Sequence, residues 1–195
     1  MSNEWYTPSR YVEAARAVMG GIDLDPASCE LANKIIKAKE YYSEAQNGLL
    51  HAWRGRVWLN PPYGLIDTTP TACRYKSSGA DTQKRSLQTM FVRKALSEYA
   101  CGNVAQLIML VTANTTVAWF QPLWNYPMCT PFPKIGFWVP GESEAMRQVF
   151  GNAVVYLGPH ESTFVEVFST FGRVVKAIDT PRPKPITLSL WESIE

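Results

Sequence analysis

The chemistry of this chain is concentrated in one tetrapeptide, Asn60-Pro61-Pro62-Tyr63, which directly follows an apolar stretch at residues 56–59. Proline has no N–H group and a fixed φ, and a residue that precedes proline is pushed toward extended geometry. We therefore expect a stiff corner that holds the amide of Asn60 beside the free carbonyl of Pro61, with the ring of Tyr63 next to them. Two acceptors and a stacking plane are what a flat exocyclic amine needs if it is to be held.

Such a corner suits methyl transfer to an amine. The exocyclic amine of adenine is a poor nucleophile because its lone pair is delocalised into the ring, and acceptors on both N–H groups return density to the nitrogen. The side-chain oxygen of Asn60 and the carbonyl of Pro61 can accept, and Tyr63 can stack. A sulfonium methyl held in line is then attacked directly, through placement and fixed dipoles alone. All four residues, Pro62 included, are candidate catalytic residues; the alternative is an ordinary turn that contains two prolines.

Composition limits the class of protein. A chain of 195 residues with 46% hydrophobic and 18% charged residues is typical of one globular domain with a real core. No apolar run approaches the length of a membrane span, and the N-terminus lacks a signal pattern, so we expect a cytoplasmic protein without a membrane partner. The net charge is only +2, so contacts with nucleic acid must come from local patches.

The residues that usually bind metals are scattered. No close pairs occur among the four cysteines, and the two histidines stand alone, so we expect reduced thiols and no metal site. These residues are Cys29, Cys73, Cys101, Cys129, His51 and His160.

Apolar periodicity and turn signals divide the chain into alternating elements. Helices are expected after Thr7 as N-cap with Pro8 as first residue, after Ser28 as cap, and at residues 87–100, 116–124 and 162–171. Strands are expected at residues 22–25, 38–42, 56–59, 105–112, 135–139, 153–157 and 174–178. This alternation predicts a doubly wound α/β sheet of about seven strands.

The elements also predict where a site must lie. In doubly wound sheets, ligands bind outside the carboxyl ends of the strands, near the point where the strand order reverses. The acidic segment Asp23 to Pro26 follows one predicted strand, and Asn60 follows another. We therefore expect these two segments to meet on the same rim.

Four blocks in the first third of the chain form a specific set when they are taken in order. They are Trp5-Tyr6-Thr7-Pro8, residues 21–28 with Ala32-Asn33, Asn47-Gly48-Leu49 with Trp53, and residues 57–64. This set resembles the phage-type DNA N-6-adenine methyltransferases. A weaker likeness continues at residues 91–95, 119–120 and 164–172, and the main gap is at residues 65–89.

The resemblance implies a fold, a reaction and a setting. The fold is that of class I methyltransferases, with a mostly parallel seven-stranded sheet in a single domain over residues 1–195. The reaction is site-specific transfer of a methyl group from S-adenosylmethionine to the exocyclic amine of a flipped adenine in DNA. The implied protein is encoded by a phage or prophage, acts in the cytoplasm of a bacterial host, and is a monomer or weak homodimer.

The resemblance also assigns residues to the methyl donor. Thr7 and Pro8 match a Thr-Pro pair that helps to hold the amino acid end of the donor, which suits the free N–H groups of a helix N-terminus. Thr7 can equally be only a helix cap. Asn47 matches the polar residue that contacts the adenine amine of the donor, or it is a turn residue beside Gly48.

The segment after the first strand takes the place of the usual donor loop. Asp25 is the first choice to pair with the ammonium of the donor, and Asp23 is the second choice or a cap. Pro26, Ala27 and Ser28 stand where most relatives of the wider class have Gly-x-Gly. The acid that grips the donor ribose is not identified, with Glu30 and Glu40 as weak candidates.

A polar insert at residues 65–89 follows the tetrapeptide and is the candidate DNA-recognition loop. Between residues 74 and 94 there are six basic residues and one acid, Asp81, which suits phosphate contacts. The alternative is a solvated loop without a role. The predicted DNA contacts are Arg74, Lys76, Lys84 and Arg85.

Two other functions fit the same residues. The tetrapeptide suits any planar amine or amide, so RNA or a protein glutamine can be the acceptor. The missing Gly-x-Gly leaves open a non-catalytic module that binds nucleic acid and keeps the fold.

Overall fold

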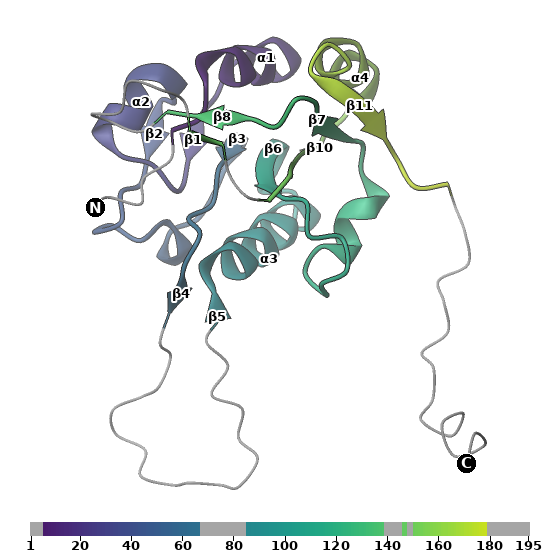
Figure 1. The fold of residues 1–195 in the computed structure, drawn as a ribbon. Helices are drawn as coiled ribbons and strands as arrows, with labels where there is room; N and C mark the ends of the chain where they lie inside the picture. The colour runs from purple at the N-terminus through teal and green to yellow at the C-terminus, as the bar shows by residue number, and fades with distance from the viewer. Residues whose placement is uncertain (1–5, 67–84, 139–145, 148–149, 179–195) are drawn as a thin grey trace, which may run out of the picture.

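The computed structural model describes residues 6–66, 85–138, 146–147 and 150–178, which form a seven-stranded sheet with helices on both faces (Figure 1). The strand order is β11-β7-β10-β6-β3-β1-β2. The strands are β1 (Leu24–Asp25), β2 (Glu40–Tyr41), β3 (Gly55–Leu59), β6 (Val104–Thr112), β7 (Met128–Pro131), β10 (Asn152–Leu157) and β11 (Gly172–Val175).

The sheet is parallel on one side and antiparallel on the other. Strands β2, β1, β3 and β6 pair in parallel, whereas β10 is antiparallel to both of its neighbours, β6 and β7, and β11 is antiparallel to β7. Strand β7 therefore runs in the direction of the parallel group. The carboxyl ends of β1 and β3 lie on one edge, because these strands are parallel neighbours.

Two hydrophobic clusters hold the layers together. Helices α1 (Ser9–Met19), α2 (Glu30–Ile36) and α4 (Glu161–Phe168) cover one face, and α3 (Leu87–Ala100) with the 3₁₀ segment η2 (Gln121–Asn125) covers the other. This arrangement explains why β6 is an almost continuous apolar run, since its side chains are buried on both faces.

Several elements differ from the sequence prediction. The helix expected at residues 116–124 is replaced by η2, and β7 was not predicted. The strand expected at residues 135–139 lies outside the main sheet, because β8 (Gly136–Phe137) pairs with β9 (Met146–Arg147) and Trp138 bridges Tyr6. The last strand, β11, begins and ends earlier than expected.

Both predicted helix caps are wrong by one residue. Pro8, with φ −56° and ψ 137°, is the N-cap of α1 rather than its first residue, and Thr7 precedes the cap. In α2 the cap is Cys29 rather than Ser28, and the Cys29 sulfur accepts the N–H of Ala32 at 3.4 Å. Thr7 is therefore free for a different role.

The ends of the insert leave the body as a short antiparallel pair, β4 (Leu65–Ile66) and β5 (Arg85–Ser86) (Figure 1). Strand β5 leads directly into α3, and the N–H of Leu87 donates to the carbonyl of Gly64 at 2.9 Å. The start of α3 is thus fixed beside the tetrapeptide. Among the described residues, none of the helices combines the length and the apolar character that a membrane crossing requires.

Candidate active site

The tetrapeptide extends from the carboxyl end of β3, whose last residues are fully buried. Trp58 and Leu59 have no exposed surface and belong to the two opposite hydrophobic clusters, so they anchor the strand end from both sides. Pro61 is buried, Tyr63 is partly buried and Pro62 is exposed. Packing therefore holds the chain in place up to Asn60, the residue before Pro61.

Asn60 makes a hydrogen bond to a residue far away in the sequence. Its Nδ2 donates to Oγ1 of Thr7 at 3.2 Å, across 53 residues of chain. Thr7 is only 7% exposed. The other end of the amide, Oδ1 of Asn60, is buried and has no hydrogen-bond partner among the described residues. A buried acceptor without a partner costs free energy, so this atom is a marker of a site that a ligand donor completes.

Tyr6, which precedes Thr7, is held by two other parts of the chain. The N–H of Tyr6 donates to the carbonyl of Trp138 at 2.9 Å, and the N–H of Trp138 donates back at 3.0 Å. The hydroxyl of Tyr6 lies 3.4 Å from the sulfur of Cys29, at the start of α2. Residues 6–8 thus connect the loop after β1 with the end of β3, as the shared-rim prediction requires.

Asp25 ends β1 and is almost completely buried, with 1% exposure. Its Oδ1 accepts the N–H of Ala27 at 3.1 Å. Burial raises the pKa of the Asp25 carboxyl to about 7, against the opposite effect of the Ala27 N–H and the neighbouring Ser28 hydroxyl. Among the described residues, no cation lowers this pKa, so the carboxyl suits a ligand that brings a positive charge.

Asp23 has a different environment, which favours a structural role over contact with the donor. Its carboxylate is held by Arg56, with Nε 2.7 Å from Oδ2 and Nη2 2.9 Å from Oδ1, and by Lys39 at 2.8 Å. The hydrogen bond from Arg56, followed by that from Lys39, keeps the pKa of Asp23 well below its usual range. Asp23 precedes β1, beside the first residues of β3, so it ties the amino ends of two strands rather than facing the rim.

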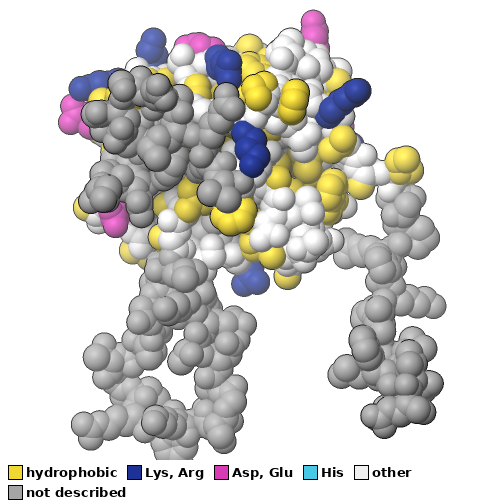
Figure 2. Space-filling view, in the orientation of Figure 1, with side chains coloured by type: hydrophobic (Ala, Val, Ile, Leu, Met, Phe, Trp, Pro, Cys, Tyr) yellow, Lys and Arg dark blue, Asp and Glu magenta, His cyan; other side chains and the backbone are white. Residues whose placement is uncertain are grey.

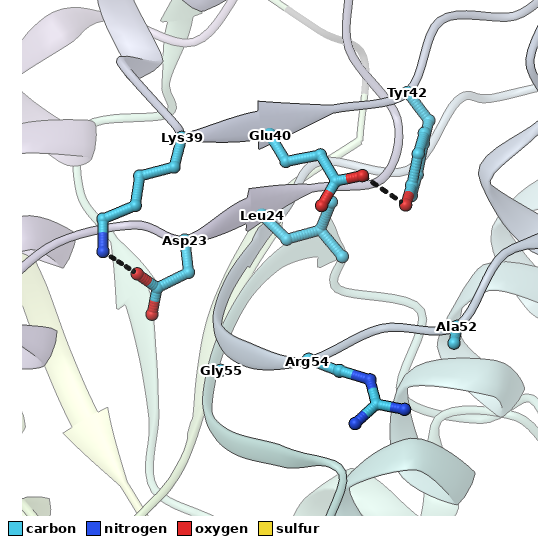
Figure 3. Close-up of a pocket in the computed structure, with 8 residues that line it drawn as sticks. All are labelled: Asp23, Leu24, Lys39, Glu40, Tyr42, Ala52, Arg54 and Gly55. Atoms are coloured by element: carbon cyan, nitrogen blue, oxygen red, sulfur yellow. Dashed lines mark hydrogen bonds and ion pairs between the residues drawn. The ribbon is translucent and has the colours of Figure 1, made fainter.

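An open cavity of about 730 Å³ lies next to this ion pair (Figure 3). Lys39 points to Asp23 there, and the hydroxyl of Tyr42 donates to Glu40 at 2.7 Å. None of the residues that line it belongs to the tetrapeptide or to the segment of Thr7. Its lining residues are Asp23, Leu24, Lys39, Glu40, Tyr42, Ala52, Arg54 and Gly55.

Asn47 begins a tight turn that presses against the donor loop. Its φ is +52°, and its Oδ1 accepts the N–H of Leu49 at 3.2 Å, where the 3₁₀ segment η1 (Gly48–Leu50) begins. A Cβ atom at Gly48 would lie 2.0 Å from the carbonyl oxygen of Pro26, so only glycine fits. The turn interpretation of Asn47 thus has direct support, and a contact with the donor stays a prediction.

Sequence reasoning missed one polar residue near the corner. Gln88, in the first turn of α3, is 5% exposed. Its Oε1 accepts the hydroxyl of Thr112 at 2.9 Å, and its buried Nε2 has no partner within the described ranges. Since Leu59 lies opposite Met109, the chain after Leu59 leaves the sheet close to the end of β6, where Thr112 lies. Gln88 occupies the buried face of α3 with Phe91, Val92 and Ala95, and a glutamine at such a position was the available signal.

A comparison with protein families identifies the chain. A family model described as DNA N-6-adenine-methyltransferase (Dam) matches residues 1–157. The chain belongs to this family. No curated protein and no solved structure matches the chain in the corresponding searches.

Membership in the Dam family confirms the resemblance stated from the sequence. It supports DNA adenine N6-methylation as the activity and DNA as the substrate. The seven-stranded sheet with helices on both faces fits a methyltransferase of this kind. The matched region includes Thr7, Asp25 and Asn60: Thr7 contacts Asn60, and Asp25 and Asn60 lie at the carboxyl ends of the parallel neighbours β1 and β3.

The DNA contacts predicted for this Dam-family chain are largely outside the described residues. Arg74, Lys76 and Lys84 fall there, and Arg85 opens β5 at the border of the described part. Figure 2 shows basic side chains spread over this face, some near its middle among hydrophobic and uncharged ones and others toward its edges, where the acidic side chains lie. Within the described residues, His, Cys, Asp and Glu side chains form no cluster that can hold a metal ion.

Proposed function

We propose that this chain transfers a methyl group from S-adenosylmethionine to the exocyclic amine of an adenine that has left the stack of a specific DNA site. The observation that carries the proposal is the amide of Asn60: its Nδ2 is held by Thr7, and its buried Oδ1 has no partner in the part of the chain that the structure describes. This acceptor stands beside Pro61, whose carbonyl is adjacent in the chain. Membership in the Dam family supports adenine as the base.

The residues of the corner fit the amine. Oδ1 of Asn60 and the carbonyl of Pro61 accept its two N–H groups, Pro62 keeps the corner stiff, and Tyr63 stacks on the base. Nε2 of Gln88, for which the described residues supply no partner, is a donor that complements a ring nitrogen of adenine. A pocket with acceptors for the amine and a donor for a ring nitrogen favours adenine over bases that present the opposite pattern.

The methyl donor is proposed to lie between β1 and the start of α1. S-adenosylmethionine supplies a methyl group on a positively charged sulfur, and the amine takes this methyl as the carbon–sulfur bond breaks and a proton leaves to water. The buried carboxyl of Asp25 pairs with the ammonium of the donor. The hydroxyl of Thr7 donates to the carboxylate of the donor, and Pro8, which has no N–H group, contributes by fixing the start of α1 beside it.

The donor loop completes this arrangement. Pro26, Ala27 and Ser28 follow Asp25 and form the wall that Gly-x-Gly forms elsewhere, and Asn47 lies on the turn that packs against Pro26. Asp23 is not included, because Arg56 and Lys39 occupy its carboxylate.

We assign the fold to the class I doubly wound methyltransferases, as one domain over residues 1–195. The insert at residues 65–89 is proposed to contact DNA through Arg74, Lys76, Lys84 and Arg85, and to supply site specificity. The proposed setting is the cytoplasm of a bacterial host, with a phage or prophage as the source of the gene.

The test is transfer of labelled methyl groups from S-adenosylmethionine to DNA, RNA and protein offered in parallel. We expect DNA to be labelled on adenine, and Asn60→Ala to reduce turnover by about 100-fold or more, since one fixed dipole at the reacting group is lost. Asn125→Ala, an exposed asparagine on η2, is the matched control and keeps wild-type turnover. Wild-type turnover in Asn60→Ala, or label only in RNA or protein, overturns the proposal.

A further inference from the structure

We propose that Thr7 is a positioning residue, which turns the amide of Asn60 so that its oxygen faces the acceptor amine. The inference rests on the proposed function and on one contact, the 3.2 Å hydrogen bond from Nδ2 of Asn60 to Oγ1 of Thr7. Thr7 then acts on the reaction through Asn60, in addition to any contact with the donor.

The orientation of an asparagine amide decides whether this corner works. The oxygen and the NH₂ group of an amide have almost the same size, so packing alone selects weakly between the two orientations. With Oδ1 toward the substrate, the amide accepts an N–H from the amine. With NH₂ toward the substrate, two donors meet, and the amine loses the acceptor that makes it nucleophilic.

A hydroxyl alone does not make this choice, because it can donate to Oδ1 as well as accept from Nδ2. The choice is made when the hydroxyl proton of Thr7 is taken by another acceptor. Among the described residues no group accepts this proton, and Thr7 stands directly before Pro8, at the start of α1, where the carboxylate of the donor is proposed to lie. If a carboxylate accepts the proton of the Thr7 hydroxyl, the hydroxyl oxygen can only accept a further hydrogen bond. The donor group of the Asn60 amide, Nδ2, must then face Thr7.

The surrounding contacts make this relay rigid. The bridge between Tyr6 and Trp138 and the contact of Tyr6 with Cys29 fix the backbone that carries Thr7. Thr7 itself is buried, so water does not compete readily for its hydroxyl. Binding of the donor therefore fixes the direction of two hydrogen bonds. Thr7 donates to the carboxylate, and Nδ2 of Asn60 donates to Thr7.

The experiment compares Thr7→Val, which keeps the shape of the side chain and removes the hydroxyl, with Thr7→Ser, which keeps the hydroxyl. Single-turnover methyl transfer is measured at saturating S-adenosylmethionine and DNA. We expect Thr7→Val to be slower by roughly 30-fold, as for the loss of one buried hydrogen bond to a reacting group, and Thr7→Ser to stay within about threefold of wild type.

A second readout does not depend on activity. The side-chain NH₂ signals of Asn60 in ¹⁵N spectra are assigned by their absence in Asn60→Ala, and S-adenosylhomocysteine, which carries the same carboxylate, is then added. We expect these signals to move in wild type and in Thr7→Ser but not in Thr7→Val. Thermal melting checks that each variant is folded.

Three results overturn the inference: wild-type single-turnover rates in Thr7→Val, full recovery of that variant by excess donor, and equal losses in Thr7→Ser and Thr7→Val. Recovery by excess donor means that Thr7 only binds the donor. If the wild-type protein methylates nothing, the proposed function fails, whereas the spectra still decide whether the donor carboxylate orients Asn60 through Thr7.

Discussion

Burial raises the pKa of the Asp25 carboxyl to about 7. The native carboxyl keeps a proton up to about pH 7, whereas an unfolded one loses it near pH 3.8. The native state thus binds the additional proton between these values, and the free energy of unfolding falls as pH rises through this interval. A buried carboxyl that weakens the free protein at neutral pH is a reason to expect a cationic ligand beside it.

This leads to a prediction for donor binding. S-adenosylmethionine should bind more tightly at pH 7.5 than at pH 6, because the ammonium pairs with the ionised carboxyl and the proton of Asp25 must leave first. Calorimetry in buffers of different ionisation enthalpy should detect the release of about one proton per donor at pH 6. Asp25→Asn should bind weakly, with no release of this proton. Wild-type affinity in Asp25→Asn would remove Asp25 from the donor site.

At the scale of elements, the two ends of β1 have opposite tasks. Asp25, at the carboxyl end, is buried and has no cationic partner among the described residues. Asp23, before the amino end, forms ion pairs with Arg56 of β3 and with Lys39. The same contact surrounds Gly55, where φ is +74° and a Cβ would lie 2.8 Å from Oδ2 of Asp23. The pair thus fixes the register of β1 and β3 below the site.

We predict that Asp23→Asn weakens the fold and leaves the chemistry intact. The native pKa of Asp23 is lowered, so its ion pairs stabilise the protein above the ordinary pKa of aspartate, and this stabilisation is lost as pH falls. Thermal melting from pH 3 to pH 7 should therefore show a lower and flatter curve for the variant. Its donor affinity at pH 7.5 should match that of wild type; a large loss of affinity without a change in melting temperature would return Asp23 to the donor site.

The sequence predicted the elements whose causes are local. The end of β3 at Leu59, directly before the Pro-Pro pair, and the apolar run of β6 were predicted because proline geometry and continuous hydrophobicity act within a few residues. Strand β7 was missed because its four residues, which include Thr130 and Pro131, become a strand only through pairing with β10 and β11. Strand β7 therefore forms through hydrogen bonds with strands that come later in the chain.

The site was predictable to a similar degree. Asn60 and Thr7 were proposed as site residues from motifs, but their hydrogen bond spans 53 residues and required the fold. Spacing alone did not separate Asp23 from Asp25, since the difference is Arg56, which arrives from another strand. Gln88 was missed because a single polar residue in an amphipathic helix does not form a recognisable sequence motif.

At the scale of the whole molecule, a net charge of +2 leaves little general attraction for DNA. Association must then depend on a small number of local phosphate contacts, for which the insert supplies the candidates. Each contact releases counterions, which makes the affinity dependent on salt.

We predict that Arg74→Gln with Lys76→Gln lowers the slope of log affinity against log salt by about 0.9 for each residue that contacts a phosphate. The matched control is Arg173→Gln with Lys176→Gln, which removes the same charge near β11, at the opposite edge of the sheet from β2. Binding of duplex DNA between 50 and 300 mM salt, about the range in which such slopes are measured, gives both values. Equal slopes for the two double variants would mean that Arg74 and Lys76 do not contact the phosphates of the DNA.

The β4–β5 pair has a consequence for how such a protein diversifies. Its two strands close the base of the insert, one next to Tyr63 and the other at the start of α3, where Leu87 is bonded to Gly64. We expect that loops of different sequence can join these two strands without displacing Asn60 or Thr7. We therefore expect target preference to change by exchange of a short cassette, while the machinery that transfers the methyl group is inherited intact.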